Sequence, residues 1–436
     1  MKTTNRFARL FVAALLFVSF SAARAELEKK PDDPYFAKFM PVKAPAAKTL
    51  LLKQGDRLAI CGDSITEQKM YSRLIETYLT VCVPDLKITA RQYGWSGETA
   101  EGFLRRMTND CLRFQPTIAT TCYGMNDHRY KAYDEAVAKW YEENYSAVAK
   151  SFTAAGTRVV FGSAGCVGKM PGWVKSASGT VEDLNLNLCK LRNLDIAIAE
   201  REGLRFADVF WPMFVARFNA WNMYGTNFCA AGHDGVHPGW AGHTIMAYAY
   251  LKAMGLDGDL GAITVDLKSG KAAATGGHSV TKMENGEVTV ASTRYPFCAG
   301  GETNSDASIR AGMTLVPFNQ DLNRLNLVVT GGTALSYDIT WGETTLNYSP
   351  RQLAAGINLA ADFAKNPFCD AFKKVDDAVG AKQSYETKQI KQIFHGPEGK
   401  NMEAAVQKTE AERAPLAAAI QTAFVPVTHV IKITPR

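Results

Sequence analysis

Short apolar runs alternate with longer segments of helical periodicity over residues 57–254. The longer segments repeat apolar residues every three or four positions, which predicts amphipathic helices, the last of them over 240–254. The apolar runs that predict strands are RLAIC (57–61), KITARQY (87–93), PTIATTCYG (116–124), TRVVFGSAG (157–165) and LRFADV (204–209). Alternation of this kind is typical of a parallel sheet covered by helices on both faces. We therefore predict an α/β domain over residues 56–257.

The pattern changes after residue 258, where apolar and polar residues alternate. Asn285-Gly286, between two such stretches, is a strong signal for a β-hairpin. We predict a β-rich module of antiparallel strands over 258–349. Helical periodicity then returns, and FVPVTHVIKI predicts a terminal strand, so residues 350–436 form a helical segment that ends in a strand. Four prolines over residues 26–55 predict an extended lead-in.

The first 25 residues have the pattern of a secretory signal peptide. Lys2, Arg6 and Arg9 are basic, residues 10–20 are apolar, and small residues precede a cleavage position after Ala25. A membrane anchor is the alternative, but the apolar stretch is shorter than the about 20 residues that span a bilayer. No later segment is apolar enough to span one. We therefore predict an exported protein, periplasmic or extracellular, without a membrane span.

Composition and charge narrow the class of protein. The 436-residue chain is 47% hydrophobic and 21% charged, as in soluble globular proteins. Its formal net charge of +6 includes four basic residues of the signal peptide, so the mature chain carries about +2. This nearly neutral charge gives no reason to expect nucleic acid as a partner.

The nine cysteines all follow the signal peptide, and an odd number cannot pair completely within one chain. Cys61 and Cys122 lie in apolar, strand-like runs and are predicted to be buried free thiols. One or two disulfides among the cysteines stay open. No Cys-x-x-Cys occurs, so neither a redox motif nor a structural zinc site is indicated.

Three predicted strands are each followed by a residue that can take part in, or stabilise the negative charge of, an acyl-transfer reaction. Ser64 follows the first strand, Gly97 lies in YGWSGET after the second, and Asn126 lies in YGMND after the third. The carboxyl ends of parallel strands meet at one edge of a sheet, where ligands bind. There a serine can act as a nucleophile, a glycine lets backbone N–H groups approach a ligand, and an asparagine amide can donate to an oxyanion. Each turn can also simply cap a helix.

A base for the serine is predicted in HDGVHPGWAGH, just before the last helix of the α/β domain. Asp234 and His237 are three residues apart, so the aspartate can accept from one imidazole nitrogen while the other faces Ser64. Serine needs such a base because its hydroxyl is a poor nucleophile until its proton is removed.

Together these residues resemble the SGNH hydrolases, the superfamily of GDSL-type esterases and lipases. The four blocks of the family match, in order, Gly62-Asp63-Ser64, the glycine of Ser96-Gly97-Glu98-Thr99, Gly124-x-Asn126-Asp127 and Asp234-x-x-His237-Pro238. The resemblance implies a flavodoxin-like three-layer α/β/α sandwich around a five-stranded parallel sheet. It implies that Ser64 is the nucleophile, His237 the general acid/base and Asp234 its orienter. The implied oxyanion hole consists of the backbone N–H groups of Ser64 and Gly97 and the side-chain amide of Asn126.

The resemblance also implies an exported serine esterase that forms an acyl-enzyme on Ser64 and uses no cofactor. The superfamily includes polysaccharide deacetylases, lipases, lysophospholipases and thioesterases. An exported enzyme with an extra β-rich module is similar to the carbohydrate O-acetylesterases, so we expect an acetylated glycan or another small ester as substrate. A lipase or lysophospholipase is the alternative, although no amphipathic lid segment lies beside the four blocks.

Several residues beside the blocks have assignable roles. Trp95 and Trp173 are candidates for the rim of the substrate site, and Trp95 can instead pack under its turn. Asp63 is expected to hydrogen-bond the backbone of its turn, and Asp127 is expected to cap or brace a loop; neither is expected to act in catalysis. His128, beside the asparagine block, is expected on the surface.

No cofactor or metal site is predicted. His237 and His243 are six residues apart, not the four that place two ligands on one helix face, and no His-Glu-x-x-His occurs. GSAGCVGKM (162–170) resembles a phosphate-binding loop, but Ser163 stands where the loop needs its first glycine and Met170 stands where it needs Ser or Thr.

Residues 258–436 have three interpretations. They can form a glycan-binding module with Trp341 and Tyr348 as sugar-stacking aromatics, or those two side chains can belong to the core of the β-rich module. Alternatively, NPFCDAFKKV (366–375) and the helices around it fold back to close the catalytic cleft.

Overall fold

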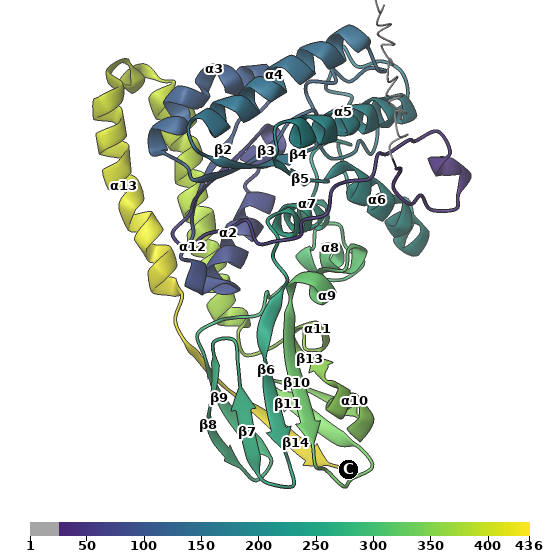
Figure 1. Cartoon of the computed structure of the whole chain (residues 1–436), viewed down its shortest axis with the longest axis vertical. Helices are drawn as coiled ribbons and strands as arrows, with labels where there is room; N and C mark the ends of the chain where they lie inside the picture. Colours follow the sequence, from purple (N-terminus) through teal and green to yellow (C-terminus); the bar gives the residue numbers. More distant parts are fainter. Residues whose placement is uncertain (1–25) are drawn as a thin grey trace, which may run out of the picture.

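The computed structural model of the protein describes residues 26–436 (Figure 1). The predicted signal peptide lies outside these residues. Among the helices of residues 26–436, none combines the length and apolar character needed to cross a membrane. The lead-in contains a 3₁₀ turn, Pro34–Phe36, and packs Phe36 and Phe39 against Phe214 of helix α6 (Phe210–Tyr224).

A five-stranded parallel sheet forms the centre of the α/β part, in the order β2-β1-β3-β4-β5. Its strands are β1 (Arg57–Gly62), β2 (Thr89–Gly94), β3 (Ile118–Cys122), β4 (Arg158–Gly162) and β5 (Arg205–Ala207). Helices cover both faces (Figure 1): α3 (Ala100–Asp110), α4 (Glu135–Ala154) and α5 (Val181–Arg201) on one, α2 (Tyr71–Val81) and α7 (Trp240–Ala253) on the other. Every residue of β3 is buried, as a strand covered on both faces requires. The predicted α/β/α fold is confirmed.

Two further sheets lie at the opposite end of the molecule (Figure 1), in the orders β13-β10-β6-β7 and β12-β11-β14-β9-β8. The strands before the last helices are β6 (Asp259–Asp266), β7 (Lys271–Ala274), β8 (His278–Glu284), β9 (Glu287–Ser292), β10 (Arg324–Thr330), β11 (Tyr337–Trp341), β12 (Thr344–Tyr348) and β13 (Ile357–Asn358). Two short helices, α8 (Ile309–Leu315) and α9 (Phe318–Leu322), precede β10.

Residue patterns in the sequence predicted where these strands lie more accurately than they predicted which strands pair and in which direction. The predicted hairpin at Asn285-Gly286 joins β8 and β9, and its two residues have φ of +50° and +78°, as a type I′ turn requires. The prediction of antiparallel strands is wrong for one pair, because β6 and β10 are parallel. The long connection between them returns the chain to the same end of the sheet, which parallel pairing needs.

The last part of the chain contacts both halves of the molecule (Figure 1). Helices α12 (Cys369–Lys388) and α13 (Met402–Ala423) form a hairpin beside β2 and α2, whereas β14 (Val427–Pro435) pairs with β9 and β11. The connecting elements are α10 (Pro350–Ala355), α11 (Leu359–Asp362), a π-helical turn (Gln389–Phe394) and a 3₁₀ turn (Pro397–Asn401). A β-rich and helical C-terminal region is therefore confirmed. The division into domains after residues 257 and 349 stays a prediction.

The C-terminal region shares the hydrophobic core of the α/β part. On the α3/α4 face, a cluster that includes Phe103 also contains Phe394 of the π-helical turn. On the α2/α7 face, a second cluster continues from Tyr78 through Phe297 to Trp341 in the β-rich part. Because these clusters cross from one part to the other, each part buries apolar surface that the other supplies.

Burial decides the predictions about four individual side chains. Trp341 and Tyr348 have exposed fractions of 0% and 8%, so the sugar-stacking interpretation is wrong for both residues and they belong to the core. Cys61 and Cys122 are buried free thiols, as predicted. All nine cysteines lie within the described residues, and none is paired in a disulfide there.

Candidate active site

Ser64 lies directly after β1, at the start of the short helix α1 (Ser64–Glu67). The cap of this helix is Asp63, whose Oδ1 accepts the backbone N–H of Ile65 at 2.9 Å. Capping by the preceding aspartate fixes the turn and leaves the serine hydroxyl to another partner.

That partner is His237, which joins Ser64 to Asp234 by two short hydrogen bonds. Its Nε2 lies 2.8 Å from Ser64 Oγ, and its Nδ1 lies 2.6 Å from Asp234 Oδ2. The backbone N–H groups of Val236 and His237 donate to the other carboxylate oxygen at 2.9 and 2.8 Å. Because an ionised carboxylate only accepts hydrogen bonds, Nδ1 carries the proton and Nε2 accepts from the serine hydroxyl.

The surroundings of Asp234 keep it charged. Burial acts to raise the pKa of Asp234, but the backbone N–H groups of His237 and Val236 and the imidazole together hold it below its usual value. An ionised carboxylate fixes the imidazole in the tautomer that can take a proton from serine.

Gly97 occupies an exposed turn after β2. Its φ is +75°, a left-handed conformation that glycine adopts without strain, and no atom lies within 4 Å of the place where a Cβ would stand. The backbone of this turn is therefore open to a ligand from the site.

The side chain of Asn126 bridges the first two strand-end turns. Its Nδ2 donates to the carbonyl oxygen of Glu98 at 3.0 Å and to Asp63 Oδ2 at 3.3 Å. Its Oδ1 accepts from the hydroxyl of Tyr130 at 3.1 Å. Glu98 and Asp63 are neighbours in sequence of the turn glycine and of the serine, so the amide lies between the groups predicted to bind an anion.

Two buried carboxyls brace these turns, as the sequence predicted. Burial raises the pKa of Asp63 to about 7 and that of Asp127 to about 6. Asp127 accepts the backbone N–H groups of Ala100 and Gly124, both at 2.9 Å. It thereby ties the turn after β3 to the start of α3.

The prediction that His128 lies on the surface is wrong. Its exposed fraction is 1%, its Nδ1 lies 2.6 Å from the carbonyl oxygen of Met125, and its ring packs on Tyr130 with centroids 4.7 Å apart. Burial lowers the pKa of His128 to about 4, so the imidazole is neutral near pH 7. The turn after β3 folds inward here, which no local sequence pattern signals.

Trp173 forms an open rim beside the imidazole. Its ring centroid lies 5.5 Å from that of His237 and 5.8 Å from that of Tyr130, and 52% of the tryptophan is exposed. The aromatic face of this side chain is therefore available to a substrate next to the serine.

Trp95, next to the Gly97 turn, contacts the C-terminal region. His395 places its ring 4.8 Å from the indole, and the ammonium group of Lys391 lies 5.2 Å from the indole centroid. Sequence reasoning missed both partners, because they are separated from Trp95 by about 300 positions and no local pattern links them.

One group of side chains among residues 26–436 could hold a metal ion. Cys229, His233 and Asp306 place three ligand atoms within 4.8 Å of one another. Asp306 already accepts the backbone N–H of Cys229 at 2.7 Å and pairs with His233 at 3.1 Å. Oδ2 of Asp306 makes both contacts, so these three residues are already joined to one another by protein contacts. The absence of a metal site stays a prediction.

The parallel sheet and its strand-end turns define the fold of an SGNH-type hydrolase. Residues 60–245 match the model of the GDSL-like Lipase/Acylhydrolase family. The chain therefore contains a GDSL-like lipase/acylhydrolase domain over these residues, which is the domain of a carboxylic ester hydrolase. No curated protein gave a match to the chain.

One solved structure extends the likeness in fold beyond this domain. A gut microbial diltiazem-metabolizing enzyme aligns over 90% of this chain and 100% of its own, with a TM-score of 0.73 and 21% identity. An acetylxylan esterase from Geobacillus stearothermophilus aligns over 47% of this chain and 97% of its own, with a TM-score of 0.38 and 20% identity. The first alignment shows that a solved enzyme shares the fold, C-terminal region included.

Proposed function

We propose that the protein is a serine esterase in which Ser64, His237 and Asp234 form the catalytic triad. The observation that carries the proposal is the unbroken hydrogen-bond chain from Ser64 Oγ through the imidazole to the carboxylate of Asp234. These two hydrogen bonds support the proposal, because a base in the required tautomer lies within hydrogen-bond distance of the serine hydroxyl.

The reaction proceeds in two halves. As Ser64 Oγ attacks the ester carbonyl, His237 Nε2 takes the hydroxyl proton, and the carboxylate of Asp234 stabilises the imidazolium. The imidazolium then gives its proton to the leaving alcohol, and the acyl group stays on Oγ. A water molecule, deprotonated by Nε2, hydrolyses the acyl-enzyme and restores the serine.

The oxyanion of each tetrahedral intermediate is bound, in this proposal, by the backbone N–H groups of Ser64 and Gly97 and by the amide of Asn126. The position of the Asn126 amide between the two turns supports this assignment. Its 3.3 Å bond to Asp63 is the longer of its two donated bonds, so it is the one that can be exchanged for an oxyanion.

We further propose that the substrate is an acetylated carbohydrate. The exposed ring of Trp173 supports this, because an aromatic face beside the imidazole suits the apolar face of a sugar ring. The predicted export of the protein places it where glycans occur.

The test compares p-nitrophenyl acetate, butyrate and octanoate as substrates of the wild type and Ser64→Ala. We expect Ser64→Ala to lower kcat by about 10⁴-fold or more, because the residual rate depends on the oxyanion hole and on binding alone. Ser151→Ala, on the outer helix α4, is the matched control and keeps full activity. A preference for acetate, followed by acetate release from an acetylated polysaccharide, supports deacetylation.

Other outcomes contradict specific parts of the proposal. Wild-type activity in Ser64→Ala would show that another residue is the nucleophile. A preference for octanoate would replace the carbohydrate substrate by a lipid ester. Acid-quenched enzyme that carries no acyl group on the peptide containing Ser64 would contradict the covalent intermediate.

A further inference from the structure

The turn that carries Gly97 is held from two sides. The backbone N–H of Trp95 donates to the carbonyl oxygen of Gly62 at 3.0 Å. Oε2 of Glu67 accepts both the backbone N–H and the hydroxyl of Ser96, the latter at 2.6 Å. Glu67 belongs to the short helix that begins at the candidate nucleophile. One carboxylate therefore connects the serine turn to the glycine turn.

The charged partner of Glu67 comes from the C-terminal region. Nζ of Lys391 lies 2.7 Å from Oε1 and 2.9 Å from Oε2 of Glu67. The two side chains are 27% and 18% exposed, so water screens this ion pair less than one on the open surface. The same ammonium group also lies over Trp95.

Lys391 lies in the π-helical turn Gln389–Phe394. Turns of this kind are rare and are frequently found at functional sites. Here the turn buries Ile390 and Phe394 in the core on the α3/α4 face while Lys391 reaches the serine helix. An unusual backbone conformation thus coincides with the contact to the candidate site.

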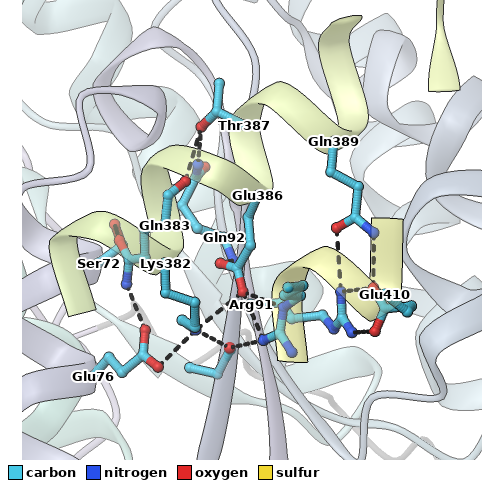
Figure 2. Close-up of polar contacts among 12 residues, drawn as sticks. Ser72, Glu76, Arg91, Gln92, Lys382, Gln383, Glu386, Thr387, Gln389 and Glu410 are labelled. Carbon is cyan, nitrogen blue, oxygen red and sulfur yellow. Dashed lines mark hydrogen bonds and ion pairs between the residues drawn. The ribbon is translucent and has the colours of Figure 1, made fainter. Parts of the chain in front are cut away.

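Buried polar contacts fix the base of the hairpin on strand β2 (Figure 2). Nζ of Lys382 lies 2.7 Å from Glu76 and 3.0 Å from Glu386. Glu386 accepts the backbone N–H of Gln92, in β2, at 3.1 Å. Since β2 is an edge strand of the parallel sheet, the hairpin covers an edge that would otherwise be open. The position of Lys391 therefore rests on a rigid base.

We propose that Lys391 is a positioning residue for ester hydrolysis. Through Glu67 it holds the Ser96–Gly97 turn so that the Gly97 N–H points at the oxyanion. This inference rests on the proposed function, because it assumes that Gly97 is an oxyanion donor. The hairpin α12–α13 is then a working component of the active site and not a separate binding module.

The test measures kcat and KM for p-nitrophenyl acetate with the full chain and the variants Lys391→Met and Lys391→Arg. Lys391→Met keeps most of the length of the side chain and removes the charge. We expect its kcat to fall about tenfold, less than the 10²–10³-fold lost when an oxyanion donor is removed outright. We expect KM to change by less than about twofold, because ground-state binding is untouched. Lys391→Arg restores the ion pair and most of kcat.

Arg73→Met is the matched control. Arg73 pairs with Asp376 at 2.9 Å, a contact that also joins the α/β part to α12 but does not lead to the glycine turn. We expect its kcat to equal that of the wild type.

The pH dependence of kcat gives a second readout. Burial acts to raise the pKa of Glu67, but Lys391 and Ser96 hold it below its usual value; Lys69 is a second cation close to this carboxylate. Without Lys391 the carboxyl group protonates more readily, and a protonated Glu67 accepts only weaker, uncharged hydrogen bonds from Ser96. On the acid side of the profile, kcat should therefore begin to fall at a higher pH in Lys391→Met than in the wild type.

An unchanged kcat in Lys391→Met, or equal losses in Lys391→Arg or Arg73→Met, would overturn the inference. If Lys391→Met does not fold, Glu67→Gln replaces it, because glutamine keeps an acceptor for Ser96 and loses the ion pair; it should lower kcat in the same way. Ser64→Ala, measured in parallel, separates the two proposals. Activity that survives Ser64→Ala contradicts the triad, whereas its loss beside an unaffected Lys391→Met contradicts only this inference.

Discussion

The helical hairpin α12–α13 and the β-rich part are stabilised by opposite kinds of buried polar contact. In the hairpin, the ammonium of Lys382 lies between the carboxylates of Glu76 and Glu386, and its exposed fraction is 1%. In the β-rich part, neutral side chains hydrogen-bond one another in a row. A buried charged side chain stabilises the fold only while its oppositely charged partner is present. A row of hydrogen-bonded neutral side chains stabilises the fold only while its members stay uncharged. The two regions should therefore respond differently to mutation and to pH.

The neutral row in the β-rich part has a fixed direction. Trp341 Nε1–H donates to His429 Nδ1 at 3.0 Å, and His429 Nε2 lies 3.1 Å from Ser292 Oγ. Ser292 Oγ lies 2.7 Å from His278 Nδ1, and His278 Nε2 lies 3.0 Å from the carbonyl oxygen of Leu260. Because an indole only donates and a carbonyl only accepts, both imidazoles are neutral when all four bonds are made.

The largest effect is expected from Lys382→Met. The change leaves Glu76 buried without its cation, whereas Glu386 keeps Arg413 at 2.7 Å. The free energy of unfolding should fall by about 3–5 kcal/mol in urea titrations. The double variant Lys382→Met/Glu76→Gln should recover part of the loss, since it removes the stranded charge of Glu76. Lys408→Met, which breaks an exposed pair with Glu398, is the control and should change little. A loss below about 1 kcal/mol for Lys382→Met would show that the buried charges do not stabilise the hairpin.

A smaller effect is expected from acid in the β-rich part. Burial lowers the pKa of His429 to about 3, and burial also lowers that of His278. Because the pKa of His429 is depressed in the folded protein, this residue does not reduce stability well above the ordinary histidine pKa of about 6.5. The free energy of unfolding decreases as pH falls from there toward the pKa of His429 in the folded protein. At pH 5 the loss from His429 is about 2 kcal/mol relative to pH 8.

His429→Gln isolates this contribution, because glutamine does not titrate. The difference in unfolding free energy between pH 8 and pH 5 should be smaller in the variant by about 2 kcal/mol. Equal pH dependence in both proteins would mean that His429 does not carry the acid sensitivity.

The smallest effect is expected from Arg73→Met, at the outer side of the hairpin. Arg73 pairs with Asp376 and Asp377, but its side chain is 22% exposed. Its removal should lower the free energy of unfolding by about 1 kcal/mol or less, with less effect at high salt. If Arg73→Met lowers the free energy of unfolding as much as Lys382→Met does, buried and outer ion pairs contribute equally to stability, and the comparison is wrong.

Elements whose structure depends on residues close together in sequence could be predicted from the sequence. The five strands of the parallel sheet, the Asn285-Gly286 hairpin and the α/β/α layering follow from periodicity and turn chemistry. Ser64, Gly97 and Asn126 could be grouped because each ends a strand of one parallel sheet. Asp234 and His237 could be paired because their spacing fits a single turn.

Contacts between distant segments could not be predicted in the same way. Nothing near Lys391 indicates that it reaches Glu67, and nothing near β6 indicates a parallel partner at β10. The burial of His128 depends on Tyr130 folding over it. The acidic and basic residues of α12 look like a solvated helix face in sequence, yet Lys382 and Glu386 are buried by β2.

The place of β14 has a consequence for the order in which the molecule assembles. The chain completes β12, crosses to the α/β part to form the helical hairpin, and returns with β14 to lie between β9 and β11. Until β14 arrives, β8–β9 and β11–β12 are separate ribbons, each with an unpaired edge that a second chain could join. Pairing over such long sequence separations makes folding slow, so these edges stay open longest during refolding. Misassembly of the folding chain should therefore begin in the β-rich part and not at the catalytic sheet.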